Sequence, residues 1–225
     1  MATVACTATM IGVANVTVIL LRRTGFNKGV RKLLAMGIGQ VATAAVGSYF
    51  LISNGFGRLF TLPLSRKLAL IWVTATVAAT LTVAISNRIS GESDIPMAES
   101  FRELYCVCRP CMFALLIAVA PVCEEILFRG LGQEWLAAII GFWPALAIAA
   151  ANCTAGHVKA LGFGRQLIPV AVLAVILGVE VGVLGTLIPA MVTHAVCNLV
   201  GMHDTLIYVK GDHTVCNGGG RQWMV

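Results

Sequence analysis

Charged residues are scarce in this chain of 225 residues. Asp, Glu, Lys and Arg together make up 12% of the sequence, whereas hydrophobic residues make up 58% and the mean hydropathy is +0.88. A soluble globular domain typically carries about 25% charged residues, so the composition excludes that class. The chain is predicted to be a polytopic membrane protein.

Other familiar signals are missing as well. The eight cysteines show no disulfide-framework spacing, and the group Cys106, Cys108 and Cys111 lacks the second CxxC or nearby His of a zinc site, so it is given no role. The first apolar run has neither a preceding basic residue nor a small-residue cleavage pattern, which favours a retained helix over a removed signal peptide. No long internal repeat is visible.

Long apolar runs are what the sequence does contain. A membrane span needs about 20 mostly apolar residues, and seven stretches are candidates: 4–21, 33–52, 68–86, 111–128, 135–151, 167–186 and 187–201. The last two are separated only by a Leu-Ile-Pro step. The predicted fold is therefore an all-α transmembrane bundle of about six to eight spans, whose internal prolines favour a membrane-embedded polar cavity.

The net charge of +6 does not indicate a nucleic-acid partner, because the basic residues gather at the predicted helix ends. The partner that this pattern indicates is the lipid bilayer. The first loop holds five of them, and the positive-inside rule places that loop in the cytoplasm: Arg22, Arg23, Lys28, Arg31 and Lys32.

A single transmembrane domain is predicted over residues 1–202. Its segment 97–109 reads as an amphipathic helix at the membrane interface, because charges of both signs alternate around apolar residues. The tail, residues 203–225, is expected to be loosely ordered.

The most informative residues are two adjacent carboxylates in an apolar run. Glu124 and Glu125 lie near the end of CMFALLIAVAPVCEEILF, and Arg129 follows. Ionisable residues at membrane depth are costly to insert and usually functional. In a helix Glu125 and Arg129 share a face, whereas Glu124 is turned about 100° away. We therefore expect Arg129 to hold Glu125 and to leave Glu124 free as a general base.

Three later polar residues complete a candidate site. His157 ends an apolar segment and could hold the attacking water with Glu124, whereas His194 and Asn198 are i and i+4 on one helical face. That pair could donate hydrogen bonds to the oxyanion that forms when water attacks a carbonyl. This set fits peptide-bond hydrolysis without a covalent intermediate. The lone carboxylate Glu180 has no sequence partner and is not assigned to the site.

The run EEILFRG, a His after an apolar segment, and HAVCN resemble the EExxxR, FxxxH and HxxxN/B motifs of the CPBP intramembrane proteases. The sequence HAVCNLVG is most similar to that of the type II CAAX prenyl endopeptidases, the Ras-converting enzymes. The resemblance covers about residues 97–203. One departure is visible, because Cys153 stands where the second motif has Phe.

The resemblance implies a multi-helix membrane protease of the endoplasmic reticulum that removes the last three residues of prenylated CaaX proteins, such as small GTPases. It implies that Glu124 and His157 activate water, that Glu125 and Arg129 support them, and that His194 and Asn198 form the oxyanion hole. It implies neither a cofactor nor a metal.

Three alternatives stay open. Glu124, His157 and His194 could ligate zinc with Glu125 as base, although no HExxH is present. The buried polar groups could instead belong to a transporter or membrane scaffold. A bacterial-type CPBP protease with other membrane substrates would also fit the motifs.

Overall fold

The computed structural model describes residues 28–62, 65–90, 114–161 and 167–211. Three predicted features lie outside these ranges: the first candidate span at 4–21, the amphipathic segment 97–109 and the three grouped cysteines. Throughout the described ranges the regular structure is helical, and no strand occurs there. The predicted all-α class is thus confirmed.

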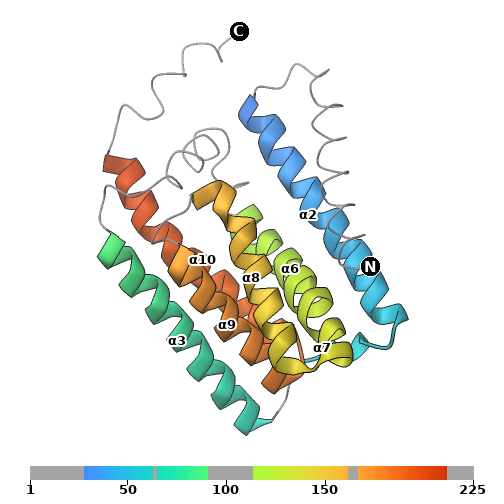
Figure 1. Cartoon of the computed structure of the whole chain (residues 1–225). Helices are drawn as coiled ribbons and strands as arrows, with labels where there is room; N and C mark the ends of the chain where they lie inside the picture. The colour runs from blue at the N-terminus through green and yellow to red at the C-terminus, as the bar shows by residue number, and fades with distance from the viewer. Residues whose placement is uncertain (1–27, 63–64, 91–113, 162–166, 212–225) are drawn as a thin grey trace.

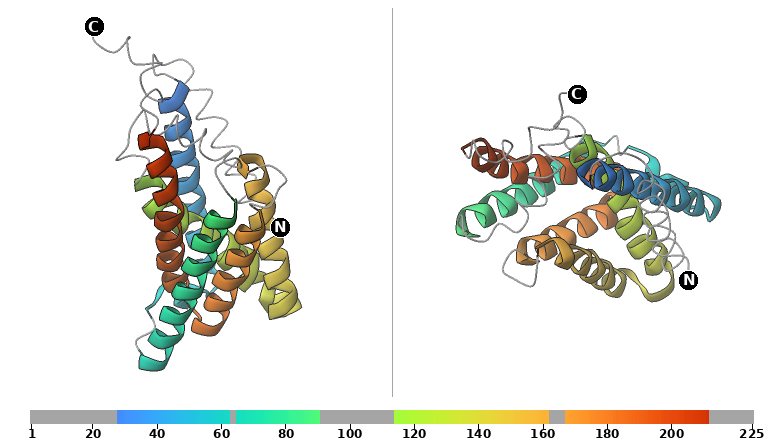
Figure 2. Two further views of the ribbon diagram at one scale, coloured as in Figure 1. Left: turned by 90° about the vertical axis from the view of Figure 1, so that its left-hand side faces the viewer. Right: turned by 90° about the horizontal axis from the view of Figure 1, so that it is seen from above.

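The helices form one array in which α2 and α3 lie at opposite ends and the helices bearing the polar residues lie between them (Figure 1; Figure 2 shows the same order from above). Their bounds are α2 Lys28–Ser53, η1 Gly57–Phe60, α3 Arg66–Ser90, η3 Ala114–Val119, α6 Ala120–Glu125, η4 Ile126–Glu134, α7 Trp135–Ile140, α8 Phe142–Leu161, α9 Leu167–Leu184 and α10 Ile188–Gly211.

Three helices in the described ranges are long and apolar enough to cross a membrane: Leu34–Ser53, Arg66–Ile89 and Leu167–Leu184. A shorter apolar stretch, Ile188–Met202, lies in α10. The four matching spans predicted from the sequence therefore coincide with helices. The chain is an integral membrane protein by this measure. Of these three helices α3 is the least buried, with 6% of its apolar window buried.

The helix that carries the Glu pair differs from the prediction. Two spans were expected, at 111–128 and 135–151, but η3, α6, η4 and α7 form one uninterrupted helical run over residues 114–140. Gly130 does not end this helix. It lies against Leu51 and Leu187 and permits their close approach. The run ends at Gly141, whose φ of +85° favours glycine.

This run alternates between two helical forms. η3 and η4 are π-helical, and the α-helical turn α6, which ends with the Glu pair, lies between them. π-Helical segments are uncommon and occur frequently at functional sites. They also shift side chains around the helix, so faces inferred from ideal α-helical spacing have to be checked against contacts.

Small residues on α9 let its neighbours approach closely. A Cβ on Gly178 would lie 2.5 Å from Gln133 Oε1 and would overlap Leu146, and one on Gly182 would overlap Phe142. Helix packing in membranes depends on such small residues, because lipid offers no hydrophobic driving force between helices. α9 is therefore held against both η4 and α8.

A tight turn joins α9 to α10. Gly185 ends α9 with φ of +69°, and its N–H donates to the Val181 carbonyl at 2.7 Å. The turn is fixed to η1, because Leu187 N and Thr186 Oγ1 both donate to the Leu59 carbonyl, at 2.8 and 3.0 Å. α10 then continues to Gly211, beyond residue 203 where the loose tail was expected to begin.

Candidate functional site

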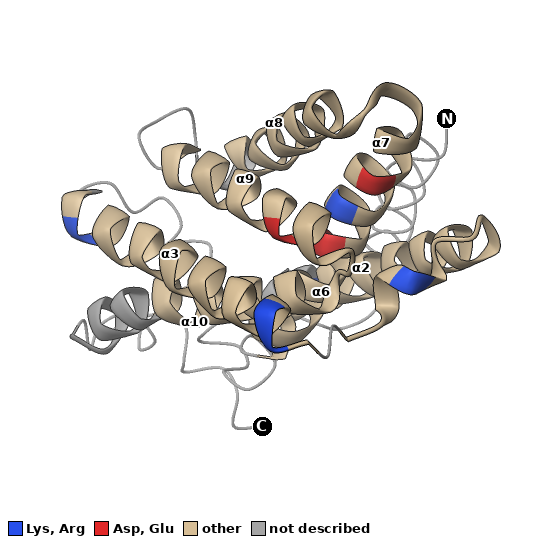
Figure 3. Cartoon of the chain, turned by 90° about the horizontal axis from the view of Figure 1, so that it is seen from below, with Lys and Arg blue, Asp and Glu red and all other residues tan. Residues whose placement is uncertain are grey.

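Glutamates of the described ranges gather inside the array. Figure 3 shows acidic positions in its middle, whereas most basic positions lie near helix ends. Glu125 and Glu180 are 0% and 2% exposed, and Arg129 is 1% exposed. Burying charges at membrane depth requires partners, so the contacts of these groups define the site.

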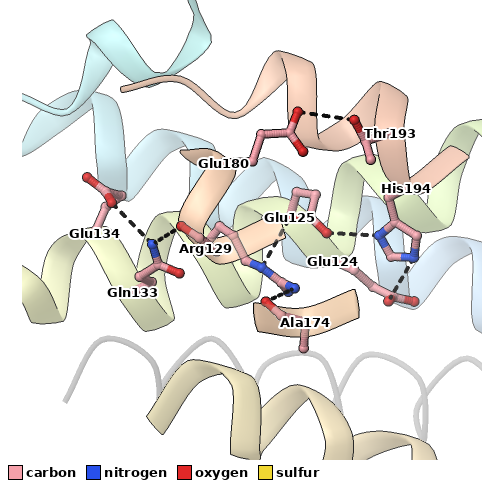
Figure 4. A network of polar contacts seen from close by, with 10 residues as sticks. Glu124, Glu125, Arg129, Gln133, Glu134, Ala174, Glu180, Thr193 and His194 are labelled. Carbon is pink, nitrogen blue, oxygen red and sulfur yellow. Dashed lines mark hydrogen bonds and ion pairs between the residues drawn. The ribbon is translucent and has the colours of Figure 1, made fainter. Parts of the chain in front are cut away.

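Arg129 neutralises Glu125. Arg129 Nε lies 3.3 Å from Glu125 Oε2, one helical turn away, as the sequence spacing predicted. Its Nη2 donates to the Ala174 carbonyl of α9 at 3.0 Å. The guanidinium therefore links the carboxylate to a neighbouring helix as well as balancing its charge (Figure 4).

Gln133 repeats this link one turn further along. It is fully buried, and its Nε2 donates to the Gly178 carbonyl at 2.7 Å. Sequence reasoning did not select Gln133. The available signal was the polar series at 125, 129 and 133, whose spacing of four residues puts all three on one side of the helix.

His194 connects α10 to both glutamates. Its Nδ1 lies 2.8 Å from Glu125 Oε1, and its Nε2 lies 3.8 Å from Glu124 Oε2. Because a carboxylate accepts, the shorter contact is an Nδ1–H donation that fixes the imidazole ring. The structure therefore brings together four of the six predicted residues: Glu124, Glu125, Arg129 and His194.

Glu124 differs from its neighbour in exposure and in partners. Its side chain is 23% exposed, and Oε2 has no hydrogen-bond partner among the described residues. Glu125, by contrast, is held by both Arg129 and His194. Of the two carboxylates, Glu124 is the one with capacity to take a proton from a reactant.

Asn198, like His194, contacts the helical run that carries the Glu pair, but at a different place. Its Nδ2 donates to the Leu116 carbonyl of the π-helical segment η3 at 2.8 Å. The amide nitrogen carries a second N–H. The pair was predicted to face one point. Both side chains contact the Glu-bearing helical run, but His194 does so at Glu125 and Asn198 at the Leu116 backbone carbonyl.

His157 lies at the edge of this cluster. Its Nδ1 lies 2.8 Å from the Cys153 carbonyl, which can only accept, so Nε2 is the nitrogen left for a reactant. Glu124 is close enough for its charge to act on the His157 ring. Cys153, at the position of the motif's Phe, is buried and packs with Ala150, Ala174 and Phe128.

The described side chains do not form a zinc-binding site. Among the described residues, no three His, Cys, Asp or Glu side chains are grouped so that they could hold a metal ion. His194 directs Nδ1 at Glu125, and His157 directs Nδ1 at its own helix. The zinc alternative thus gains no support from the arrangement of these residues.

Comparison with known proteins assigns the site-bearing segment. No curated protein and no solved structure matches the chain. Residues 108–200 match the family model described as "Type II CAAX prenyl endopeptidase Rce1-like". This segment contains the Glu pair and both later motifs, and the match confirms the resemblance predicted from them. The match therefore supports assigning this segment to the Rce1-like family of type II CAAX prenyl endopeptidases.

Proposed function

We propose that this protein is an intramembrane glutamate-type endopeptidase that removes the C-terminal aaX tripeptide from prenylated CaaX proteins. The observation that carries the proposal is the unequal pair of adjacent carboxylates. Glu125 is engaged by Arg129 and His194, whereas Glu124 keeps a buried oxygen without a hydrogen-bond partner among the described residues. The family match supports a protease of the CAAX type.

Glu124 is the proposed general base. It takes a proton from a water molecule, which then attacks the scissile carbonyl, and it later returns a proton to the leaving amine. The free Nε2 of His157 helps to orient that water. Glu125 is a poor base, because Arg129 and His194 stabilise its ionised form.

The oxyanion is stabilised from α10 in this proposal. His194 donates from Nδ1 to Glu125, and an N–H at its Nε2 is directed to the developing charge. The second N–H of Asn198 is the other donor, while the first stays bonded to the Leu116 carbonyl. Donors fixed before the reaction stabilise the transition state more than donors that must reorganise.

The family match and the membrane setting support the proposed substrate class. A prenyl group partitions into the bilayer, so a prenylated C-terminus would reach a membrane-embedded site laterally. We propose prenylated CaaX proteins such as small GTPases as substrates and the endoplasmic reticulum membrane as the location. The lipid bilayer is then both the solvent of the helices and the route of the substrate.

The decisive experiment measures tripeptide release from a farnesylated CaaX peptide by detergent-purified protein. Glu124→Ala is expected to lower kcat by at least about 100-fold, the size of effect typical for a general base. Glu134→Ala is the matched control, because Glu134 belongs to the same helical run but lies outside the catalytic cluster. Full activity of Glu124→Ala would refute the proposal.

Two further arms separate the alternatives. Inhibition by phenanthroline that added zinc reverses would favour a zinc protease. Equal cleavage of farnesylated and unprenylated peptides would favour a CPBP protease with other membrane substrates.

A further inference from the structure

α10 presents polar groups in two directions from consecutive residues. His194 points to the Glu-bearing helix, where it contacts Glu125. The preceding residue, Thr193, is turned about 100° away in an α-helix and contacts α3 and α9 instead. The rotation of α10 about its axis is therefore defined from two sides.

Thr193 is fully buried, and its hydroxyl has partners on two helices. Trp72 Nε1 of α3 donates to Thr193 Oγ1 at 3.2 Å, and Thr76 Oγ1 lies 2.8 Å away. Thr193 Oγ1 in turn donates to Glu180 Oε1 of α9 at 3.1 Å. A hydroxyl has one donor and two acceptor positions, so Thr193 Oγ1 makes all three contacts when Thr76 donates to it.

Glu180 ends this chain of contacts inside the bundle. It is 2% exposed, and its second oxygen, Oε2, has no hydrogen-bond partner among the described residues. The charges of Glu125 and Arg129 act on it, so it lies near the ion pair of the proposed active site. Figure 4 shows Glu180 and Thr193 beside His194.

The contacts between α3 and α10 extend by one more turn of both helices. Thr80, four residues after Thr76, makes a side-chain hydrogen bond with Cys197, four residues after Thr193. Little of α3 is buried, and the polar series Trp72, Thr76 and Thr80 marks the side by which this helix holds α10. Hydrogen bonds between membrane helices supply orientation as well as affinity.

We propose that Glu180, Thr193 and Trp72 form a positioning site that sets the direction of the His194 imidazole. This inference rests on the proposed peptidase activity and adds three residues that do not touch the substrate. Without the Thr193 contacts α10 could rotate, and His194 would no longer face both glutamates. Misplacement of a catalytic group by about 1 Å can cost 100-fold in rate.

The test compares side chains of matched shape. Thr193→Val keeps the volume and removes the hydroxyl, so it is expected to lower kcat about 10-fold on the farnesylated peptide with little change in KM. Thr193→Ser restores the hydroxyl and is expected to restore kcat. Thr74→Val is the control, because this exposed threonine bonds only its own helix, at the Leu70 carbonyl, among the described residues.

Three variants at the other two positions keep the test decisive should Thr193→Val fail to fold. Trp72→Phe removes one donor and retains an aromatic ring, and it is expected to lower kcat in the same way. Glu180→Gln can still accept from Thr193 and is expected to stay active, whereas Glu180→Leu cannot and is expected to lose kcat. Each kcat is expressed per folded molecule, so that a purely structural loss does not register.

The outcomes distinguish failure of the positioning site from failure of the proposed peptidase activity. A wild-type protein without turnover refutes the peptidase proposal. An active wild type with unchanged kcat in both Thr193→Val and Trp72→Phe refutes only the positioning site. Failure of Thr193→Ser to exceed Thr193→Val also overturns it, since volume would then matter rather than the hydroxyl.

Discussion

Two buried carboxylates, Glu125 and Glu180, contact consecutive residues of α10, yet their surroundings differ in kind. Glu125 lies against a guanidinium and an imidazole. Glu180 receives a hydrogen bond from the Thr193 hydroxyl and has no ion pair with a described residue. The environment of Glu125 stabilises a negative charge. At Glu180 one carboxyl oxygen accepts a hydrogen bond, but no described cation forms an ion pair with the group.

The difference shows how one helix can serve two purposes. A buried ion pair is costly to break, because removal of one partner leaves an uncompensated charge. A single hydrogen bond typically contributes less, about 0.5–1.5 kcal/mol, but its geometry is directional. The Glu125 side is therefore expected to dominate stability, and the Glu180 side to dominate the orientation of α10.

The largest expected effect is on the ion pair. Arg129→Met leaves Glu125 without its cation and should lower the free energy of unfolding by about 3–5 kcal/mol, measured by thermal unfolding in detergent. Arg66→Met, at an exposed arginine that begins α3, is the matched control and should leave the melting temperature near that of the wild type. Equal stability of the two variants would contradict the role assigned to Arg129.

An intermediate effect is expected where α9 meets the Glu-bearing helix. Gly178→Ala places a Cβ 2.5 Å from Gln133 Oε1 and against Leu146, so the helices must separate at a cost of about 1–3 kcal/mol. Gly57→Ala is the control, since a Cβ there meets nothing within 4 Å. A Gly178→Ala protein as stable as Gly57→Ala would show that α9 does not depend on this close approach.

The smallest effect is expected at Glu180. Glu180→Gln keeps the acceptor for Thr193, so its unfolding free energy should lie within about 1 kcal/mol of the wild type. Glu125→Gln, the matched change at the ion pair, should be clearly less stable because it leaves the Arg129 charge unbalanced. Chemical denaturation of both variants in the same detergent checks this, and a reversal of their order would refute the contrast between the two carboxylates.

Local spacing predicted those contacts that lie within one helix. Glu125 and Arg129 were expected to share a face, and they form an ion pair. The sequence also pointed to His194 and Asn198 on the neighbouring helix. The polar series at 125, 129 and 133 was a local signal for Gln133. Its partner on α9 and the link between Glu180 and Thr193 could not be inferred, because no local pattern encodes which helices become neighbours.

The structure differs from the prediction where two candidate spans, 111–128 and 135–151, were separated. Instead, one helical run continues from Ala114 to Ile140. Gly130 serves close packing against Leu51 and Leu187, and the charged residues find buried partners. The same residue types can end a helix or hold it to its neighbours, and only their surroundings decide which.

The sequence by itself determined that this protein is a helical membrane protein with a family-specific set of carboxylates and imidazoles, because hydropathy and spacing along a helix are local properties. The tertiary structure decided which groups from other helices reach these residues. Spacing to Arg129 already distinguished Glu125 from Glu124, but only packing placed His194 Nδ1 2.8 Å from Glu125 and its Nε2 3.8 Å from Glu124. Protein packing, which acts across distant segments, gives two like residues unlike environments.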